Sequence, residues 1–318
     1  MNYINQQLTL DQRMNMMSDQ DILDFAEEKD LEYFDALSDV AKGYSTGVIC
    51  IGPPGVGKTF DSEQVLAQQG VTHVDFLNSD WERVDDGKGP VEWECTRLET
   101  GAGPLTRASD YSNWALHADL YANRNGVLLI DDNDQIMKDT AGLSIMMKAT
   151  EHKDSRPVDF TRAQFNTELS KYGVPAKFDY QGGLVILSNF KMKDMVQAKY
   201  GSVSAKPFVT RWAALLDRME YVDMEMDHPR AVRVYVEHKI RKTDMYLNPN
   251  GYIAKRFGRA LNSIEQEQML EWVRKNQFNF QLPLSLRTTN EIAALIVRTG
   301  GVETEWKIKA ARKLCKSI

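Results

Sequence analysis

One eight-residue motif constrains the fold of this chain more than any other feature of its sequence. The segment Gly52-Pro-Pro-Gly-Val-Gly-Lys58-Thr59 matches the pattern G-x-x-x-x-G-K-[ST] at every position. It follows the apolar run Val48–Ile51 and opens a helical stretch that extends from Thr59 to about Gln69. A strand, a glycine-rich turn and a helix in this order form a phosphate-binding loop, whose backbone N–H groups surround an anion at the helix N-terminus.

The residues of this loop have separate expected roles toward a nucleoside triphosphate. The Lys58 ammonium is expected to reach the β- and γ-phosphates, and the Thr59 hydroxyl to be a ligand of Mg²⁺. The glycines allow the backbone to turn its N–H groups inward. The residues expected to contact the nucleotide are Gly52, Pro53, Pro54, Gly55, Val56, Gly57, Lys58, Thr59 and Phe60.

A second apolar run, about 70 residues after the loop, ends in two acidic residues. Val127–Ile130 is followed directly by Asp131 and Asp132. An α/β sheet presents its ligands at the carboxyl ends of its strands, so we expect Asp131 to hold Mg²⁺ and Asp132 to orient or deprotonate the attacking water. In the alternative interpretation, these acids only begin a turn and cap the helix that starts near Asp139. Asp132 is one methylene shorter than the glutamate commoner in this role, which leaves the turnover rate open.

The hydrophobic pattern predicts an α/β domain followed by a helical one. From residue 46 to residue 226, β-branched runs alternate with helical stretches, which indicates a doubly wound parallel sheet of five strands. Residues 227–318 have a helical pattern throughout. Residues 1–45 contain ten acidic and three basic residues and predict an amphipathic helical arm, with a partner-docking arm as the alternative. The predicted strands are Gly47–Ile51, His73–Leu77, Gly126–Ile130, Gly183–Leu187 and Met219–Met224.

Together with the two motifs, three later segments give the chain a resemblance to the AAA+ ATPases. Asn189 lies at the end of the fourth predicted strand, where that family has a polar residue called sensor 1. Arg218 ends a segment that looks like the helix carrying an arginine finger, with Arg211 as the substitute candidate. Arg287 stands where the family has the arginine called sensor 2. The three segments are Leu187-Ser-Asn189, Thr210–Arg218 and Pro283–Asn290.

Each of these three assignments has a structural alternative. Asn189 could cap a helix that begins near Lys191, since asparagine is a favoured N-cap. Arg218 could form an ordinary surface ion pair. Arg287 is unfavourable at a helix start because it opposes the helix dipole, so it needs an anionic partner, for which a triphosphate is suitable.

The resemblance implies that the nucleotide is ATP, hydrolysed with Mg²⁺ between a doubly wound sheet and a helical lid at residues 227–318. A finger that completes the site of a neighbouring subunit implies a homo-oligomeric ring, a hexamer, in which a lone chain hydrolyses poorly. The residue patterns of Leu120–Asp134 and Leu184–Asn189 resemble those of AAA+ proteins that tailed bacteriophages encode near DNA-metabolism genes. The resemblance therefore implies an ATP-driven motor or remodeller in DNA metabolism.

The substrate of such a motor stays open between protein and nucleic acid. Trp93, Leu105 and the aromatics of residues 152–182 could grip a polymer, or could pack their loops onto the domain. The basic stretch Glu303–Ile318 could touch nucleic acid, or could form a helix that packs through its apolar side. An alternative function is a nucleotide-dependent switch that loads or recruits a protein partner and hydrolyses slowly. A small-molecule kinase is less favoured, because no acceptor signature is visible.

Composition limits the compartment and the partners. The formal net charge of −6 argues against a chain that coats nucleic acid over its whole surface, although a local basic groove is compatible with it. The three cysteines form no CxxC pair, which fits a protein of a reducing cytoplasm. For a phage protein, this would be the cytoplasm of the host cell. No apolar run is long enough to span a bilayer, and the N-terminus does not read as a secretion signal. We expect a cytoplasmic protein without a membrane partner.

Overall fold

The chain divides into two compact units. The α/β unit comprises residues 29–52 and 58–224, and the helical unit comprises residues 1–28, 53–57 and 225–318. Helix α2 (Asp19–Lys42) contributes residues to both units. The computed structural model describes residues 10–71, 81–84, 92–95, 113–131, 134–159, 173–189, 206–224, 226 and 228–316.

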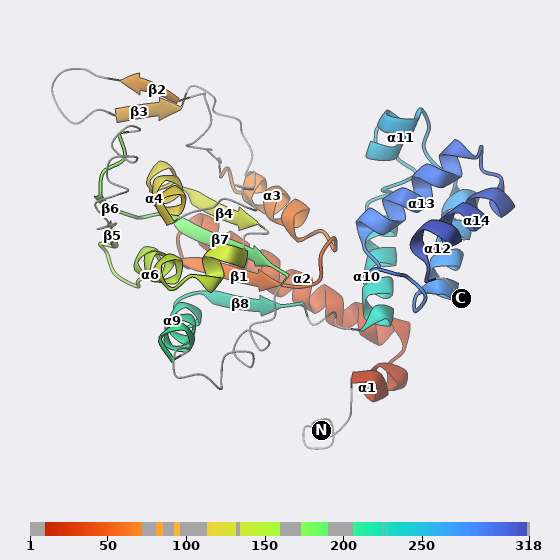
Figure 1. The fold of residues 1–318 in the computed structure, drawn as a ribbon, viewed down its shortest axis with the longest axis horizontal. Coiled ribbons are helices and arrows are strands. Elements are labelled where there is room, and N and C mark those ends of the chain that lie inside the picture. The colour runs from red at the N-terminus through yellow and green to blue at the C-terminus, as the bar shows by residue number, and fades with distance from the viewer. Residues whose placement is uncertain are drawn as a thin grey trace. The chain divides into compact units, whose positions relative to one another are not determined.

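The centre of the α/β unit is a parallel sheet (Figure 1). Its four described strands lie in the order β4 (Val127–Asp131), β7 (Gly183–Ser188), β1 (Gly47–Ile51) and β8 (Glu220–Asp223). Every residue of β1, β4 and β7 is buried, as their apolar sequences predict. The predicted α/β class and parallel sheet are confirmed. Of the five predicted strands, the one at residues 73–77 lies outside the described residues.

Helices cover both faces of this sheet, because β1, β4 and β7 are apolar on both sides. On one face, Ile49 and Ile51 belong to a core shared with the helices α4 (Asn113–Ala122), α6 (Thr140–Ala149) and α9 (Lys206–Leu216). The short helix α5 (Asp134–Lys138) precedes α6. The second half of α2 and helix α3 (Lys58–Gln68) pack together, where the hydroxyls of Tyr33 and Ser62 share a buried hydrogen bond of 2.5 Å.

Two antiparallel strand pairs complete the described part of the α/β unit. They are β2 (Trp81–Val84) with β3 (Glu92–Cys95), and β5 (Pro157–Asp159) with β6 (Lys177–Asp179). Two aromatics of the segment 152–182 are described here, and both are buried: Phe178 is 9% exposed and Tyr180 is fully buried. The Phe178 ring meets the His117 ring edge-on, with centroids 4.8 Å apart. These two aromatic side chains pack inside the α/β unit. The prediction that they could grip a polymer is therefore wrong.

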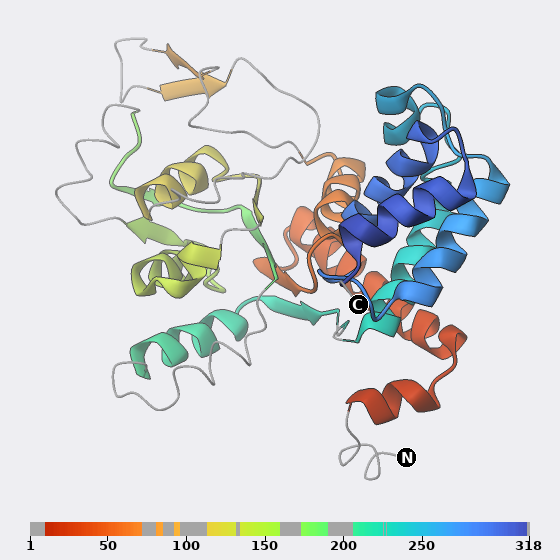
Figure 2. The ribbon, with the colours of Figure 1, turned by 45° about the vertical axis from the view of Figure 1, so that its right-hand side comes forward.

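Five helices of the helical unit follow residue 228 (Figure 2). Trp306 and Ala310 of the last helix are fully buried, and the Trp306 ring lies 6.0 Å from that of Trp272. The interpretation of the C-terminal stretch as a helix that packs through its apolar side is therefore confirmed. The five helices are α10 (Pro229–Lys242), α11 (Tyr252–Phe257), α12 (Ser263–Asn276), α13 (Leu286–Arg298) and α14 (Glu303–Leu314).

The N-terminal arm forms two helices, α1 (Leu10–Met16) and the long α2. A capping box starts α2, since the Ser18 N–H donates to Asp21 Oδ2 (2.7 Å) and the Asp21 N–H donates to Ser18 Oγ (3.1 Å). The amphipathic helix that the sequence predicts is confirmed. Its apolar stripe, at helical spacing, consists of the buried residues Ile22, Ala26, Tyr33, Leu37 and Val40.

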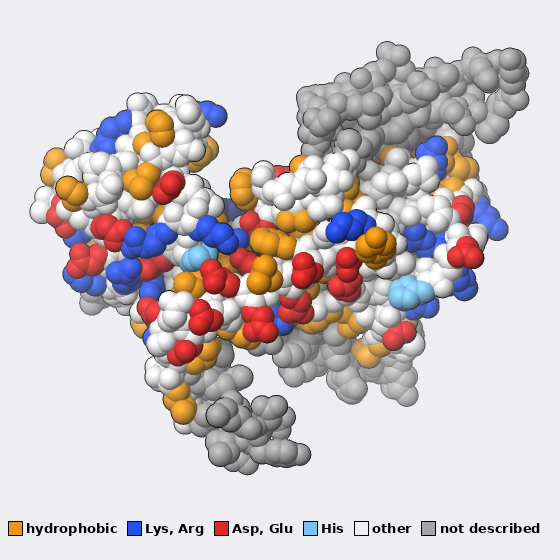
Figure 3. All heavy atoms as spheres, turned by 180° about the vertical axis from the view of Figure 1, so that it is seen from behind, with side chains coloured by type: hydrophobic (Ala, Val, Ile, Leu, Met, Phe, Trp, Pro, Cys, Tyr) orange, Lys and Arg blue, Asp and Glu red, His pale blue; other side chains and the backbone are white. Residues whose placement is uncertain are grey.

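The exposed side of α2 is acidic, and acidic side chains gather along it in Figure 3. Asp24, Glu28, Glu32 and Asp35 are all exposed on this helix. In the part of the chain that the structure describes, no helix has the length and apolar character that crossing a membrane requires.

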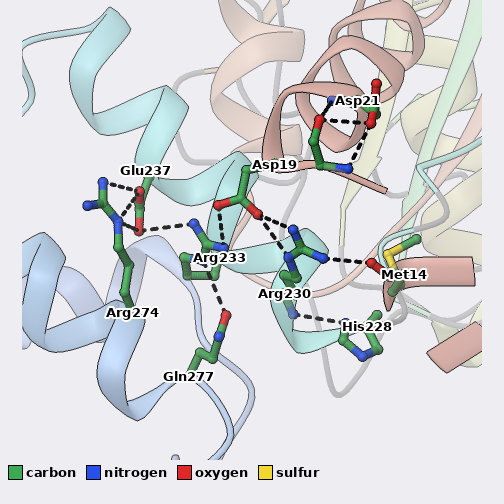
Figure 4. Close-up of polar contacts among 10 residues, drawn as sticks. Met14, Asp19, Asp21, His228, Arg230, Arg233, Glu237, Arg274 and Gln277 are labelled. Atoms are coloured by element: carbon green, nitrogen blue, oxygen red, sulfur yellow. Dashed lines mark hydrogen bonds and ion pairs between the residues drawn. The ribbon is translucent and has the colours of Figure 1, made fainter. Parts of the chain in front are cut away.

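Asp19, the first residue of α2, joins the arm to α10 (Figure 4). Its carboxylate accepts from Arg230 at 2.8 Å and from Arg233 at 2.7 Å. Arg233 is 7% exposed and also lies 3.6 Å from Glu237, which pairs with Arg274 at 2.8 Å. A chain of alternating charges therefore runs from the arm through α10 to α12.

We expect Asp19→Asn to lower the free energy of unfolding by at most about 1 kcal/mol at neutral pH, because a half-exposed pair is screened by solvent. Burial acts to raise the pKa of Asp19, but the hydrogen bonds from Arg233 and Arg230 outweigh it and hold the pKa below its usual value. The stabilisation is present above the unfolded-state pKa and is lost as pH falls through the lowered folded-state pKa.

Urea unfolding of both proteins across acidic pH measures this difference. Asp24→Asn removes the same charge from the exposed side of α2 and serves as the control. A difference between wild type and Asp19→Asn that stayed constant down to the lowest pH would contradict the ion-pair explanation.

Candidate nucleotide-binding site

The predicted phosphate-binding loop lies between β1 and α3, as expected. Gly55 and Gly57 have φ angles of 72° and 106°, which only glycine adopts without strain. Val56 between them is buried, at 1% exposure. The two glycines therefore give the loop the sharp turn that brings α3 to begin at Lys58.

On the side of the α/β unit, the Lys58 ammonium is held between two strand ends. Lys58 is 8% exposed, and its Nζ donates to the carbonyl of Gly52 (2.9 Å) and to Oδ1 of Asn189 (3.0 Å). Gly52 follows β1 and Asn189 follows β7, which is the neighbouring strand. The structure thus brings together two residues that the sequence assigns to the site independently.

A second pair forms at the end of β4. The Thr59 hydroxyl donates to Oδ2 of Asp131 at 2.5 Å, and Asp131 is the last residue of β4. Its carboxylate is 8% exposed in this arrangement. The hydroxyl and the carboxylate that the sequence selects as Mg²⁺ ligands are therefore adjacent.

Sequence reasoning missed Glu63, which lies one turn after Thr59 on α3. Burial, followed by the negative charge of Asp131, raises the pKa of Glu63 above its usual value. A second carboxylate therefore lies within electrostatic range of the Thr59–Asp131 pair. The i, i+4 spacing from Thr59 is the signal that could have identified it.

Within the helical unit, the tip of the loop contacts the start of α13. The Gly55 carbonyl accepts a hydrogen bond of 2.8 Å from the Leu286 N–H. A Cβ atom added to Gly55 would lie 2.7 Å from Cβ of Ser285 and 3.8 Å from Cγ of Arg287. Pro54, Ser285 and Arg287 line an open cavity of about 380 Å³. Arg287, the predicted sensor 2, therefore lies beside the loop.

The arginine-finger candidates are placed on α9 and just after it. Arg218 Nη1 donates to the Ala214 carbonyl at 2.5 Å, and the Arg218 carbonyl accepts from Thr46 at 2.8 Å. This arrangement does not bring Arg218 into the Lys58 group. Arg211 is half-buried on α9, and Phe60 is 59% exposed on α3. Asp132 lies outside the described residues.

Comparison of the whole sequence with protein-family models and with curated proteins finds no match. The interpretation of the site therefore depends on its own residues and geometry.

The donor set is suited to a magnesium–triphosphate complex. No group of three His, Cys, Asp or Glu side chains suitable for holding a metal occurs among the described residues. Mg²⁺ does not require one, because it is commonly bound through one or two carboxylates, with substrate phosphates and water completing its shell. Thr59 and Asp131 supply a hydroxyl and a carboxylate, and Lys58 supplies a cation for the phosphates.

We expect Gly55→Ala to lower the free energy of unfolding by about 2 kcal/mol or more. The left-handed backbone alone costs alanine about 1–2 kcal/mol, and the contact with Ser285 adds to it. Gly300→Ala is the matched control, because Gly300 has a φ of 65° in the same unit and nothing within 4 Å of an added Cβ. Urea unfolding measures both variants. Equal losses would show that close packing at the loop tip contributes nothing.

Proposed function

We propose that this chain binds ATP with Mg²⁺ and hydrolyses it as an ATPase of the AAA+ type. The observation that carries the proposal is the group formed by Lys58, Thr59 and Asp131 in the α/β unit. It offers an ammonium and a hydroxyl–carboxylate pair, spaced along the carboxyl edge of one parallel sheet. Ligands of α/β sheets bind at this edge.

The protein groups have distinct tasks in this proposal. The loop N–H groups and the Lys58 ammonium bind the phosphate oxygens and neutralise the negative charge that develops during transfer. Asn189, which already bonds to Lys58, orients the attacking water near the γ-phosphate. Asp132 accepts the proton of that water. When bound through Thr59 and Asp131, Mg²⁺ neutralises further charge on the β- and γ-phosphates.

Two arginines complete the proposed site. Arg287 binds the γ-phosphate as sensor 2, a role supported by its position beside Gly55 within the helical unit. Arg218 acts as the finger in the site of an adjacent subunit, for which its guanidinium leaves the Ala214 carbonyl. Arginine suits both tasks because its planar, permanently charged group binds phosphate oxygens in a bidentate manner.

A finger acting between subunits requires a closed homo-oligomer, and we propose a hexameric ring. The ring would use hydrolysis to move or remodel a polymer in DNA metabolism of the phage type, in the cytoplasm of the host. The resemblance of the loop, Asn189, Arg218 and Arg287 to the AAA+ pattern supports this assignment.

Lys58→Ala is expected to reduce ATP hydrolysis at least about a hundredfold, because it removes the ammonium group that binds the phosphates. Phosphate release and binding of a fluorescent ATP analogue measure the effect. Lys153→Ala is the matched control, since Lys153 belongs to the same unit but is 66% exposed and pairs with Glu151. Substantial turnover in purified Lys58→Ala protein would refute the site.

Arg218→Ala is expected to lose hydrolysis while it keeps ATP binding, since the finger acts on a neighbour. Mixing it with Lys58→Ala chains should restore part of the activity, because mixed rings contain sites with both an intact loop and an intact finger. Steady-state hydrolysis at varied mixing ratios measures the rescue. Rescue also requires that subunits exchange, which mixed-label light scattering checks. Exchange without rescue would contradict the finger assignment.

A further inference from the structure

A groove of about 340 Å³ runs between α11 and α13 on the helical unit. The side chains that line it are mostly basic or aromatic. Tyr252, Arg256 and Phe257 come from α11, and Asn290 and Arg298 come from α13. The groove is formed entirely within the helical unit, and no task in the proposed ATPase mechanism uses these five residues.

Basic charge is concentrated in this part of the chain. Residues 228–318 contain seventeen Lys or Arg and eight Asp or Glu, a net charge of +9, whereas the whole chain has −6. Elsewhere in the unit, several arginines form ion pairs with acids, as in the pairs Arg241–Glu267 and Arg274–Glu237. Among the described ion pairs, Arg256 and Arg298 have no acidic partner, and both are exposed. The groove is therefore a cationic surface.

The aromatic rings of the groove are stacked with its arginines. The Arg298 guanidinium carbon lies 4.9 Å from the centre of the Phe257 ring, and that of Arg256 lies 5.6 Å from the Tyr252 ring. Arg256 also donates to the Tyr252 hydroxyl at 2.5 Å. These contacts hold the guanidinium groups in place while Tyr252 remains 53% exposed. One surface thus presents fixed cations and an accessible aromatic face.

We propose that this groove binds single-stranded nucleic acid. Arg256 and Arg298 contact backbone phosphates, and Tyr252 stacks on a base. An exposed aromatic face favours a single strand, because the bases of a duplex are already stacked on one another. An acidic polypeptide would satisfy the cations but would leave the aromatic face without a planar partner.

This inference deepens the proposed function, because it names single-stranded nucleic acid as the polymer. The biological role of this binding rests on the proposed ATPase function, but the binding itself does not. Arg287 and the Glu291–Lys313 pair also border the groove, and Arg287 is already assigned to the nucleotide. The test therefore leaves these three residues unchanged. Binding is measured without ATP, so that the two proposals can fail separately.

The test measures fluorescence anisotropy of a labelled oligodeoxynucleotide of about 16 nucleotides. Arg256→Gln with Arg298→Gln should weaken binding about tenfold and lower the slope of log affinity against log salt by about 1.4 for two lost phosphate contacts. Arg241→Gln with Lys275→Gln is the matched control, because it removes the same charge from the same unit at paired residues outside the groove. This control should keep the wild-type slope.

Tyr252→Ala should weaken binding about fivefold or more without changing the salt slope, because it removes stacking and no charge. Phe278→Ala removes another exposed aromatic of the unit, at 57% exposure, and should bind as the wild type does. Circular dichroism and thermal melting establish that every variant is folded.

Equal weakening by the control pair or no effect of Tyr252→Ala would overturn the inference. Duplex DNA binding as tightly as the single strand, or displacement of the strand by polyglutamate at equal charge, would also overturn it. Displacement by excess ATP would assign the groove to the nucleotide and would overturn it too. Hydrolysis without strand binding contradicts this inference alone, and strand binding without hydrolysis contradicts the ATPase proposal alone.

Discussion

A buried cation is stable only where oxygen atoms surround it, and Lys58 meets this requirement through the pairing of two strands. β1 and β7 are parallel, with Ile51 opposite Ser188, so the next residue of each strand comes beside the other. Those residues supply the Gly52 carbonyl and the Asn189 amide oxygen that hold the ammonium. A one-residue slip of this register would turn Asn189 away from Lys58 and break up the site.

Much of the fold and half of the site could be predicted because their signals are local. The strands β1, β4 and β7 are built on continuous apolar runs. Asp131 ends β4, Asn189 directly follows β7, and Lys58 lies in the glycine-rich motif that follows β1. Contacts that join distant segments carry no such signal. The approach of Leu286 to Gly55 depends on tertiary packing, as does the effect of Asp131 on Glu63. For the same reason, the burial of Phe178 and Tyr180 could not be predicted from a short segment of mixed polarity.

The distribution of charge over the folded protein could not be predicted from the sequence for the same reason. A net charge of −6 describes the chain correctly and conceals its distribution. The acidic residues of α2 cover one exposed helix face, while basic residues accumulate after residue 228. Where an acidic residue meets a basic one, as at Asp19 and Arg233, the charges serve packing. Lysine and arginine side chains without an acidic partner are the ones available to an external anion. Their neighbours in the folded structure, and not in the sequence, determine which side chains these are.

The hydrogen bond from Leu286 to Gly55 has a consequence for the first turn of α13. The leading N–H groups of any helix have no acceptor within the helix, so such ends fray readily. Here one of these donors is satisfied by the loop carbonyl, and the Ser285 hydroxyl accepts from the Thr288 N–H. Unwinding of this turn would therefore release the tip of the loop, and rigidity imposed on the loop would in turn suppress fraying beside Arg287. We therefore expect the two segments to order and disorder together.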